Sequence, residues 1–339
     1  MNAERRVETG ERPTLKTISR LSGLAVTTVS RALGDAPDIS RETKKRVREI
    51  AREIGYVPNR AGVRLRTGRT NVIALVLPTE DEVMNMTPRL IASVAGALAD
   101  TPYHLIVVPE LPHQTVMDPV RYIVETGSAD AIIINRIEPE DQRVAYLREK
   151  GFPFVTHGRT VWKDRHAWFD FDNVAFGRLA VETLAARGRR NLLMFAPPLD
   201  QAYGQDIVNG AVAAAEAQGV RLILSDVTSD DMREDVAREL DEALARLPEL
   251  DGLISASPHA AMAAAGVVEA RGREVGESFD IYAKETFPIL GMFREGILSL
   301  SENIETAGRF LAEAAIHEVA TKGTAPMQKL DRPGDPASA

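Results

Sequence analysis

Residues 14–33 read TLKTISRLSGLAVTTVSRAL and contain two short helical patterns separated by a turn. Thr14 is a suitable N-cap for the first helix, and Gly23 can end that helix and turn the chain. The apolar residues between them recur at helical spacing: Leu15, Ile18 and Leu21. A second helix is expected from about Val26 to Leu33, with Gly34 as its stop. Two helices joined in this way form a helix-turn-helix, so we expect an all-α module here.

A third, strongly basic helix is expected after the helix-turn-helix. Ser40 is its N-cap, the sequence RETKKRVREIAREIGY follows at residues 41–56, and Gly55 can end it. Its apolar residues return to one face, which suffices for a small core: Val47, Ile50 and Ile54. The second helix carries short polar or basic side chains that suit base edges and phosphates: Thr27, Thr28, Ser30 and Arg31.

The charge of the chain is unevenly distributed. Residues 1–69 contain 16 Lys and Arg against 8 Asp and Glu, a net charge of +8, whereas the whole chain has a net charge of −8. The remainder therefore carries −16. This asymmetry indicates a polyanionic partner for the N-terminal part alone. A basic disordered tail is the alternative, but periodic apolar residues with helix caps favour a folded basic module.

Composition and motifs exclude several classes of protein. With 339 residues the chain is long enough for two or three cooperative units, and its lack of cysteine excludes disulfides and thiolate nucleophiles. No apolar run approaches the ~18 residues of a membrane span. The polar N-terminal segment has no signal-peptide pattern, so we expect a cytoplasmic protein that binds no membrane. Nucleotide-binding, metalloprotease and hydrolase motifs are absent and the six histidines are scattered, so we expect no enzyme, metal or cofactor.

The N-terminal segment resembles the lac repressor family of bacterial regulators. The resemblance covers residues 13–71 and rests on the quoted helix-turn-helix, on SRETKKRV and on GYVPNRAGVRLRTGRTN. It implies that the second helix lies in the major groove of operator DNA, where Val26 and Thr27 choose the bases. Arg31 can bind a guanine or a phosphate through two N–H groups. The implied DNA contacts in this module are Thr14, Leu15, Val26, Thr27, Thr28, Ser30 and Arg31.

Ala25 departs from the family pattern, because the family usually has Ser at this N-cap of the recognition helix. Loss of the cap costs about 1 kcal/mol of local helix stability and removes one phosphate hydrogen bond. The alternative is that a neighbouring Thr compensates. The sequence leaves both open.

A short helix is also expected from Arg60 to Thr67, with Asn59 as N-cap and Gly68 as stop. Eight residues are too few for a helix that persists alone in water, so it should fold on DNA. By resemblance it is the family's hinge helix, in which Leu65 wedges into a minor-groove base step. An unstructured basic linker is the alternative. The implied DNA contacts are Asn59, Arg60, Arg64, Leu65 and Arg66.

From Asn71 onward, short apolar runs such as VIALVL, HLIVVP and DAIIIN alternate with amphipathic stretches. Such alternation indicates βαβ units and parallel sheets. We expect two doubly wound parallel sheets in a two-lobed domain, with a cleft between their carboxyl edges. The domain resembles the family's periplasmic-binding-protein-like core, most clearly in FDFDNVAFGRLAVETLAARGRRN and ENIETAGRFLAEAA.

The expected organisation has five parts. They are a disordered arm at 1–13, the helix-turn-helix domain at 14–57, the hinge helix or linker at 58–69, the two-lobed effector-binding and dimerisation domain at 70–325, and a disordered tail at 326–339. Residues 321–339 contain no leucine heptad, so we expect a homodimer rather than a tetramer. Two-fold symmetry of the protein implies a pseudo-palindromic operator.

The resemblance places a small-molecule effector in the cleft, where this chain departs from the family at informative positions. Ile207 stands before Gly210 where a sugar-gripping Arg is usual, and Lys284-Glu285 stands where an aromatic-Asp pair is common. Arg159 is the nearest charged candidate, while Trp162 or Trp168 could stack on a sugar, although Trp168 sits in a strand-like run. The expected effector contacts are Arg159, Trp162, Gln201, Tyr203, Gln205, Ser257, His259 and Glu285.

The sequence therefore predicts a transcription regulator, a repressor of carbohydrate uptake or catabolism genes whose operator affinity responds to a sugar or sugar derivative. One alternative is a co-repressor-dependent regulator that responds to a purine or another metabolite. A solute-binding protein without DNA function is the other, but it would need a signal peptide and would not carry this N-terminal module. Nothing in the sequence fixes whether the effector weakens or strengthens DNA binding.

Overall fold

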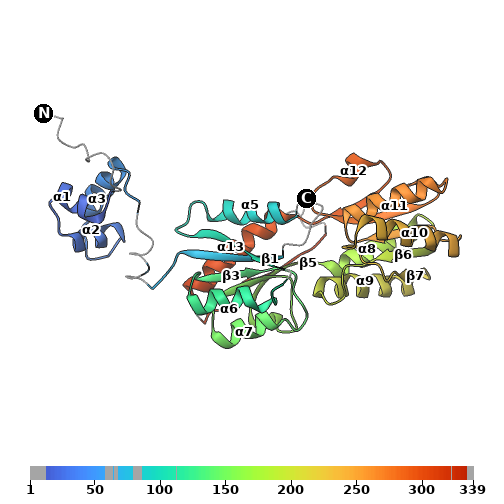
Figure 1. Cartoon of the computed structure of the whole chain (residues 1–339), viewed down its shortest axis with the longest axis horizontal. Coiled ribbons are helices and arrows are strands. Elements are labelled where there is room, and N and C mark those ends of the chain that lie inside the picture. The colour runs from blue at the N-terminus through green and yellow to red at the C-terminus, as the bar shows by residue number, and fades with distance from the viewer. Residues whose placement is uncertain are drawn as a thin grey trace. The chain divides into compact units, whose positions relative to one another are not determined.

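The computed structural model describes residues 13–57, 64, 68–78, 86–111, 113–321 and 323–333. The chain divides into two compact units, one ending at Thr70 and one beginning at Asn71 (Figure 1). The arm expected at residues 1–13 lies, apart from Pro13, outside the described residues. None of the helices in the described part is both long and apolar enough to cross a membrane.

The first unit contains the predicted helix-turn-helix and a third helix. Thr14 caps the first helix, and Gly23 ends it with a φ of +73°, a left-handed conformation that glycine adopts without strain. The small core is built from side chains of all three helices that are fully excluded from solvent: Ile18, Val29, Ala32 and Val47. The three helices are α1 (Leu15–Ser22), α2 (Val26–Leu33) and α3 (Arg41–Glu53).

The recognition helix α2 begins without a side-chain cap. Ala25 occupies its N-cap position, and its methyl side chain cannot accept a hydrogen bond from the amides of the first turn. At α3, by contrast, the Ser40 hydroxyl accepts a hydrogen bond of 3.2 Å from the Thr43 amide. The structure thus agrees with loss of the cap rather than with compensation by a neighbouring Thr.

The first lobe of the second unit is built on a parallel sheet of order β11-β5-β4-β3-β1-β2. Helices α5 and α13 cover one face of this sheet, and α6 and α7 cover the other (Figure 1). The strands are β1 (Val72–Pro78), β2 (His104–Glu110), β3 (Ala131–Ile134), β4 (Phe154–His157), β5 (Ala167–Phe171) and β11 (Gln328–Asp331). The helices are α5 (Met86–Leu98), α6 (Met117–Thr126), α7 (Gln142–Lys150) and α13 (Ile304–Ala320), with a 3-10 turn at Lys163–Arg165.

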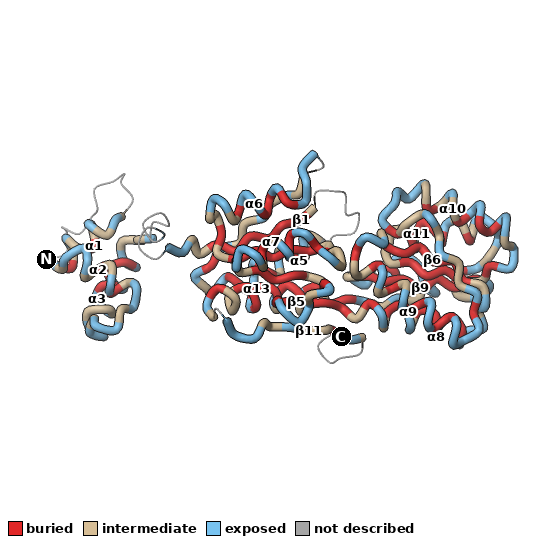
Figure 2. Tube along the Cα trace, turned by 90° about the horizontal axis from the view of Figure 1, so that it is seen from below, coloured by how far each residue is buried: buried red, intermediate tan, exposed pale blue. Residues whose placement is uncertain are grey.

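The second lobe has a parallel sheet of order β10-β9-β8-β6-β7, so the expectation of two parallel sheets is confirmed. Its buried strands lie between α8 and α9 on one face and α10 and α11 on the other, and form the red core of this lobe in Figure 2. The strands are β6 (Asn191–Phe195), β7 (Arg221–Leu224), β8 (Gly252–Ser255), β9 (Asp280–Glu285) and β10 (Leu298–Ser301). The helices are α8 (Asn173–Ala186), α9 (Ala202–Gln218), α10 (Arg233–Arg246), α11 (Pro258–Ala270) and α12 (Leu290–Phe293).

The chain crosses between the lobes after β5 and again after β10. Helix α9, which starts at the lobe junction, is fixed by close packing on α8. A Cβ atom on Gly177 would lie 2.0 Å from the Ile207 carbonyl oxygen, and one on Gly210 would lie 2.1 Å from the Val174 carbonyl oxygen. Glycine at both positions therefore lets the two helix backbones touch.

The expectation of a disordered tail from residue 326 was wrong for its first part. Strand β11 pairs in parallel with β5, with Leu330 opposite Asp170, and the Asp172 amide donates to the Asp331 carbonyl at 2.8 Å. The Pro and Gly residues that suggested disorder flank a four-residue run that completes the sheet edge. The domain expected to end at residue 325 thus continues through β11, and residues 334–339 lie outside the described part.

Replacing Ala25 with Ser should restore the missing N-cap of α2. A Ser hydroxyl there can accept from the free amides of the first turn, which stabilises the helix by about 1 kcal/mol. Hydrogen exchange of the α2 amides in the full chain should slow about fivefold. Ala25→Val, which cannot cap, serves as the control, and equal exchange rates in the two variants would contradict the assignment.

Candidate functional site

The exposed face of α2 is the candidate DNA-reading surface. Val26 is 38% exposed and Thr27 is exposed, so both of the residues expected to choose bases are accessible at the start of the helix. Thr28 and Ser30 are half-buried, and Leu15 is a half-buried residue packed on the small core. The hydroxyl of Thr14 accepts from the Thr17 amide in the capping box of α1.

Arg31 lies at the end of α2 and pairs with Asp38 at 2.6 Å, although more than half of its side chain is exposed. An exposed ion pair of this kind is worth ~0.5 kcal/mol. Arg31 can therefore leave Asp38 and bind a phosphate or a guanine with only a small loss of free energy.

The expected hinge helix lies mostly outside the described residues. Asn59, Arg60, Leu65 and Arg66 are among the residues not described. Arg64 is helical and exposed, and its carbonyl accepts from the Gly68 amide at 2.8 Å. Gly68 has a φ of +71°, as at the end of a helix.

A buried ionic cluster lies where the chain crosses between the lobes. Lys284 of β9 lies 2.6 Å from one oxygen of Glu302, and His157 of β4 lies 3.2 Å from the other. Lys284 also donates to the Asn173 side-chain oxygen at 2.9 Å. Burial opposes ionisation of Glu302, yet Lys284 and the His157 ring hold its pKa at about 2. The cluster joins a lobe-one strand, a crossover and a lobe-two strand, so it ties both lobes to the junction.

Arg159, the charged candidate predicted from the sequence, lies between two carboxylates. Its Nε atom donates to Asp170 of β5 at 2.6 Å, and its Nη2 atom donates to Asp206 of α9 at 2.9 Å. Its guanidinium also lies over the ring of Trp168, 5.8 Å from the centroid. Burial raises the pKa of Asp170 to about 6 although Arg159 opposes that shift. Arg159 of lobe one therefore connects the two lobes through its ion pair with Asp206 of lobe two.

Two buried side-chain amide oxygens near the junction have no hydrogen-bond partner within the described chain. They are Oδ1 of Asn135, just after β3, and Oε1 of Gln201, the N-cap of α9. The two segments meet where the Ala202 amide donates to the Ile137 carbonyl across the lobes at 2.8 Å. Both oxygens are acceptors, so they match a ligand or water that presents O–H or N–H groups. Gln201 was predicted from the sequence, whereas Asn135 was missed because it reads as the end of an apolar strand.

The other expected effector residues from lobe one and α9 contact protein groups. Trp162 packs on the lobe-one core, with the Arg148 guanidinium 5.4 Å from its ring centroid. Tyr203 packs on the lobe-two core, 6.0 Å from the Lys284 ammonium. Gln205 donates to the Leu199 carbonyl at 2.8 Å. Of these three residues, Tyr203 lies beside the junction cluster, because its ring is close to the Lys284 ammonium group.

Three expected effector residues are engaged within lobe two. The Ser257 hydroxyl donates to the Ser229 carbonyl at 2.7 Å, and the His259 ring bonds the Asp231 carbonyl at 3.1 Å. Glu285 is buried and accepts from the Ser299 hydroxyl and from two amides at the start of α12. Because both its carboxylate oxygens are occupied, we leave Glu285 out of the effector site proposed below.

Comparison with known proteins identifies two matching families. Residues 14–59 match the family described as "Bacterial regulatory proteins, lacI family". Residues 99–288, more than half of the chain, match the family described as "Periplasmic binding protein domain".

Two curated relatives match almost the whole chain, and a third matches just over half of it. The HTH-type transcriptional regulator CelR of Thermobifida fusca is 26% identical over 95% of this chain and 96% of the relative. AglR of Rhizobium meliloti (strain 1021) is 27% identical over 94% and 91%. RafR of Escherichia coli is 35% identical over 56% of each chain.

Solved structures share the fold. A CelR–cellobiose complex superposes with a TM-score of 0.67 at 24% identity, covering 95% of this chain and 97% of that one. The lac repressor dimer bound to operator and the anti-inducer ONPF gives a TM-score of 0.79 at 15% identity, with the same coverage. Both contain the helical module followed by the two-lobed domain found here.

Replacing Asp170 with Asn should change how stability depends on pH. The folded chain holds the Asp170 proton up to a pKa of about 6, whereas the unfolded chain releases it near pH ~4. This carboxyl therefore favours the folded state below pH ~4, and that contribution, roughly 2–3 kcal/mol, is lost as pH rises through ~6.

Urea unfolding of wild type and variant at several pH values between 4 and 7.5 measures this contribution. Asn cannot ionise, so the variant should lose less stability across this window than wild type does. The control is Asp226→Asn at an exposed loop position, which should follow the wild-type curve. Parallel curves for Asp170→Asn and wild type would refute the assignment.

Proposed function

Because this chain belongs to the lacI family of bacterial regulatory proteins, we propose that it represses carbohydrate-utilisation genes under the control of a neutral sugar bound between its lobes. The family assignment makes it a DNA-binding transcription regulator and not an enzyme. The choice of a sugar rests on the chemistry of the lobe junction. The CelR–cellobiose complex and a similar protein named "Sucrose operon repressor" agree with that choice.

The observation that carries the proposal is the pair of buried acceptors without partners. Oδ1 of Asn135 and Oε1 of Gln201 each lack a donor in the described chain, and leaving a buried acceptor unsatisfied costs ~1–3 kcal/mol. A sugar presents several hydroxyl donors and can satisfy both oxygens. Tyr203, two residues after Gln201 on α9 and only partly buried, provides an aromatic ring of the kind that stacks on sugar rings.

The charges at the junction favour a neutral ligand. Arg159 is matched by Asp170 and Asp206, and Lys284 is matched by Glu302. A phosphate or carboxylate on the ligand would have to displace one of these carboxylates. A neutral hydroxylated ligand needs no such exchange, which favours a sugar over a sugar acid.

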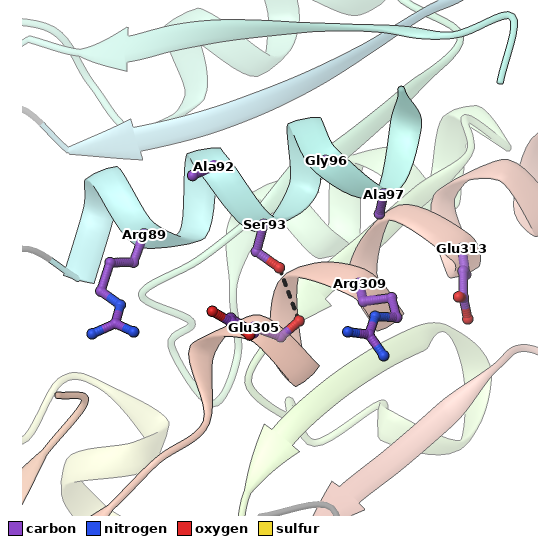
Figure 3. A pocket seen from close by; sticks show the side chains of 8 residues that line it. All are labelled: Arg89, Ala92, Ser93, Gly96, Ala97, Glu305, Arg309 and Glu313. Carbon is purple, nitrogen blue, oxygen red and sulfur yellow. Dashed lines mark hydrogen bonds between the residues drawn. The ribbon is translucent and has the colours of Figure 1, made fainter. Parts of the chain in front are cut away.

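We further propose that two copies pair through α5 and α13 of lobe one. A groove of about 540 Å³ runs between these helices, with a floor of small side chains on α5 (Figure 3). Its rim carries both signs of charge, and Ser93 donates to the Glu305 carbonyl at 2.8 Å across it. A surface that carries both signs of charge beside a floor of small side chains can match a two-fold copy of itself. The residues that line the groove are Arg89, Ala92, Ser93, Gly96, Ala97, Glu305, Arg309 and Glu313.

The effector assignment is tested by ligand binding and operator binding together. Neutral disaccharides, sugar acids and purines are screened by thermal shift on the full chain, and the best ligand is titrated by calorimetry. Asn135→Ala and Gln201→Ala should each weaken ligand binding about tenfold, because each removes one buried hydrogen bond to a hydroxyl. Gln218→Ala at the exposed end of α9 is the matched control.

The same ligand should change affinity for a pseudo-palindromic operator by about 5- to 150-fold. Operator must change ligand affinity by the same factor, because linkage is reciprocal. If purines bind and sugars do not, the sugar assignment fails. Equal ligand affinities with and without operator would mean that the cleft does not control DNA binding.

The pairing surface is tested by the oligomeric state. Gly96→Glu places a bulky charge in the floor of the groove and should shift sedimentation from dimer to monomer. Tyr122→Glu, on the exposed face of α6 across the sheet, should leave the dimer intact. A tetrameric wild type, or a dimer unaffected by Gly96→Glu, would overturn this part of the proposal.

A further inference from the structure

Contacts between the two lobes include two groups that differ in position and burial. Apart from them, the Arg89 guanidinium of α5 lies over the ring of Phe287 in lobe two, 4.9 Å from its centroid. The first group is the cluster at the crossovers, where Lys284, Glu302 and His157 have side chains no more than 11% exposed. The second group joins residues of the two lobes away from the crossovers. It contains two ion pairs between side chains and one hydrogen bond between backbone groups.

The ion pair closer to the crossovers joins Arg159, in the loop after β4, to Asp206 in α9 at 2.9 Å. Asp206 is 31% exposed, whereas Asp170, the other partner of Arg159, is 6% exposed. Asp170 lies in the same lobe as Arg159. The Arg159–Asp170 contact can therefore survive a movement of lobe two, while the Arg159–Asp206 contact cannot.

The second ion pair lies farther from the crossovers. Arg136 follows β3 in lobe one, and it lies 3.3 Å from Asp230, which follows β7 in lobe two. β7 is the edge strand opposite β10, the strand that leads into a crossover. Arg136 also has a φ of +51°, an unusual conformation for a residue with a side chain. The loop is thus held in a specific shape at the point where its side chain reaches the other lobe.

Rotation of one lobe about the crossovers moves remote atoms farthest. Groups at the crossovers keep their partners, while groups at the far end of the cleft separate first. Partly exposed partners lose less on separation than buried ones, because water reaches both charges. The buried cluster is therefore suited to be the fixed point of such a rotation, and the two partly exposed pairs are suited to break.

We propose that Arg159–Asp206 and Arg136–Asp230 form a latch that holds the two lobes in one orientation, and that the lobes rotate only when both pairs separate. The regulatory meaning of the latch rests on the proposed function, because an effector would then act by shifting the balance between latched and unlatched lobes. The latch itself is a property of the chain without ligand or DNA.

The Ala202 amide provides a direct readout of the latch, because it donates to the Ile137 carbonyl across the lobes at 2.8 Å. Hydrogen exchange of a peptide containing Ala202 is measured in the full-length protein without ligand. Asp206→Asn and Asp230→Asn should each speed exchange about threefold to fivefold, and the double variant should speed it about tenfold or more. Exchange of the core amides of α8 should stay unchanged, which shows that lobe two remains folded.

Glu182→Gln is the matched control. It removes a carboxylate from the Arg178–Glu182 pair of 2.7 Å, which lies on α8 within one lobe. Its exchange at Ala202 should equal that of wild type. Exchange within twofold of wild type in the double variant would overturn the latch.

A second measurement, of operator affinity, tests the latch and the proposed function independently. Operator affinity of the ligand-free double variant should differ from that of ligand-free wild type. Faster exchange at Ala202 with unchanged operator affinity keeps the latch and refutes control of DNA binding by the lobes. Unchanged exchange refutes the latch whatever the operator affinity is.

Discussion

The buried ammonium group of Lys284 constrains the lobe junction more than any other single group described. A lysine whose side chain is 10% exposed needs a carboxylate partner, since an unpaired buried charge costs several kcal/mol. Glu302 meets that need from the second crossover, and it draws His157 of lobe one into the same cluster. The position of β9 relative to the crossover and to β4 is thereby set. The Lys284–Glu302–His157 cluster thereby fixes the positions of the cleft residues of one lobe relative to those of the other.

Much of the fold could be predicted because its signals are local. The helix-turn-helix is specified by Thr14, by Gly23 and by apolar residues that return every three or four positions, so its helix bounds follow from the sequence. The parallel sheets follow from apolar runs that alternate with amphipathic stretches. β11 could not be found in this way, because a four-residue strand within the six residues between Pro326 and Pro333 carries no periodic signal and forms only by pairing with β5.

The candidate site was harder to predict because its contacts join residues distant in sequence. Lys284 was visible as a departure from the family, but its partner Glu302 lies in a crossover whose position depends on the folded lobes. Glu285 offered a carboxylate beside it, and only packing reveals that this carboxylate caps α12 from inside the core. Asn135 ends an apolar strand, so its unsatisfied oxygen becomes visible only once the burial around it is known.

The departure at Ile207 has a structural counterpart on the opposite lobe. Ile207 is fully buried in the lobe-two core, so α9 cannot present a cation from that position. Its neighbour Asp206 instead accepts the guanidinium of Arg159, which reaches α9 from lobe one. A cation thus lies beside the same turn of α9, but it is attached to the other lobe and is already paired. Any ligand that draws on Arg159 must therefore compete with a contact between the lobes, so that ligand recognition and lobe orientation depend on the same side chain.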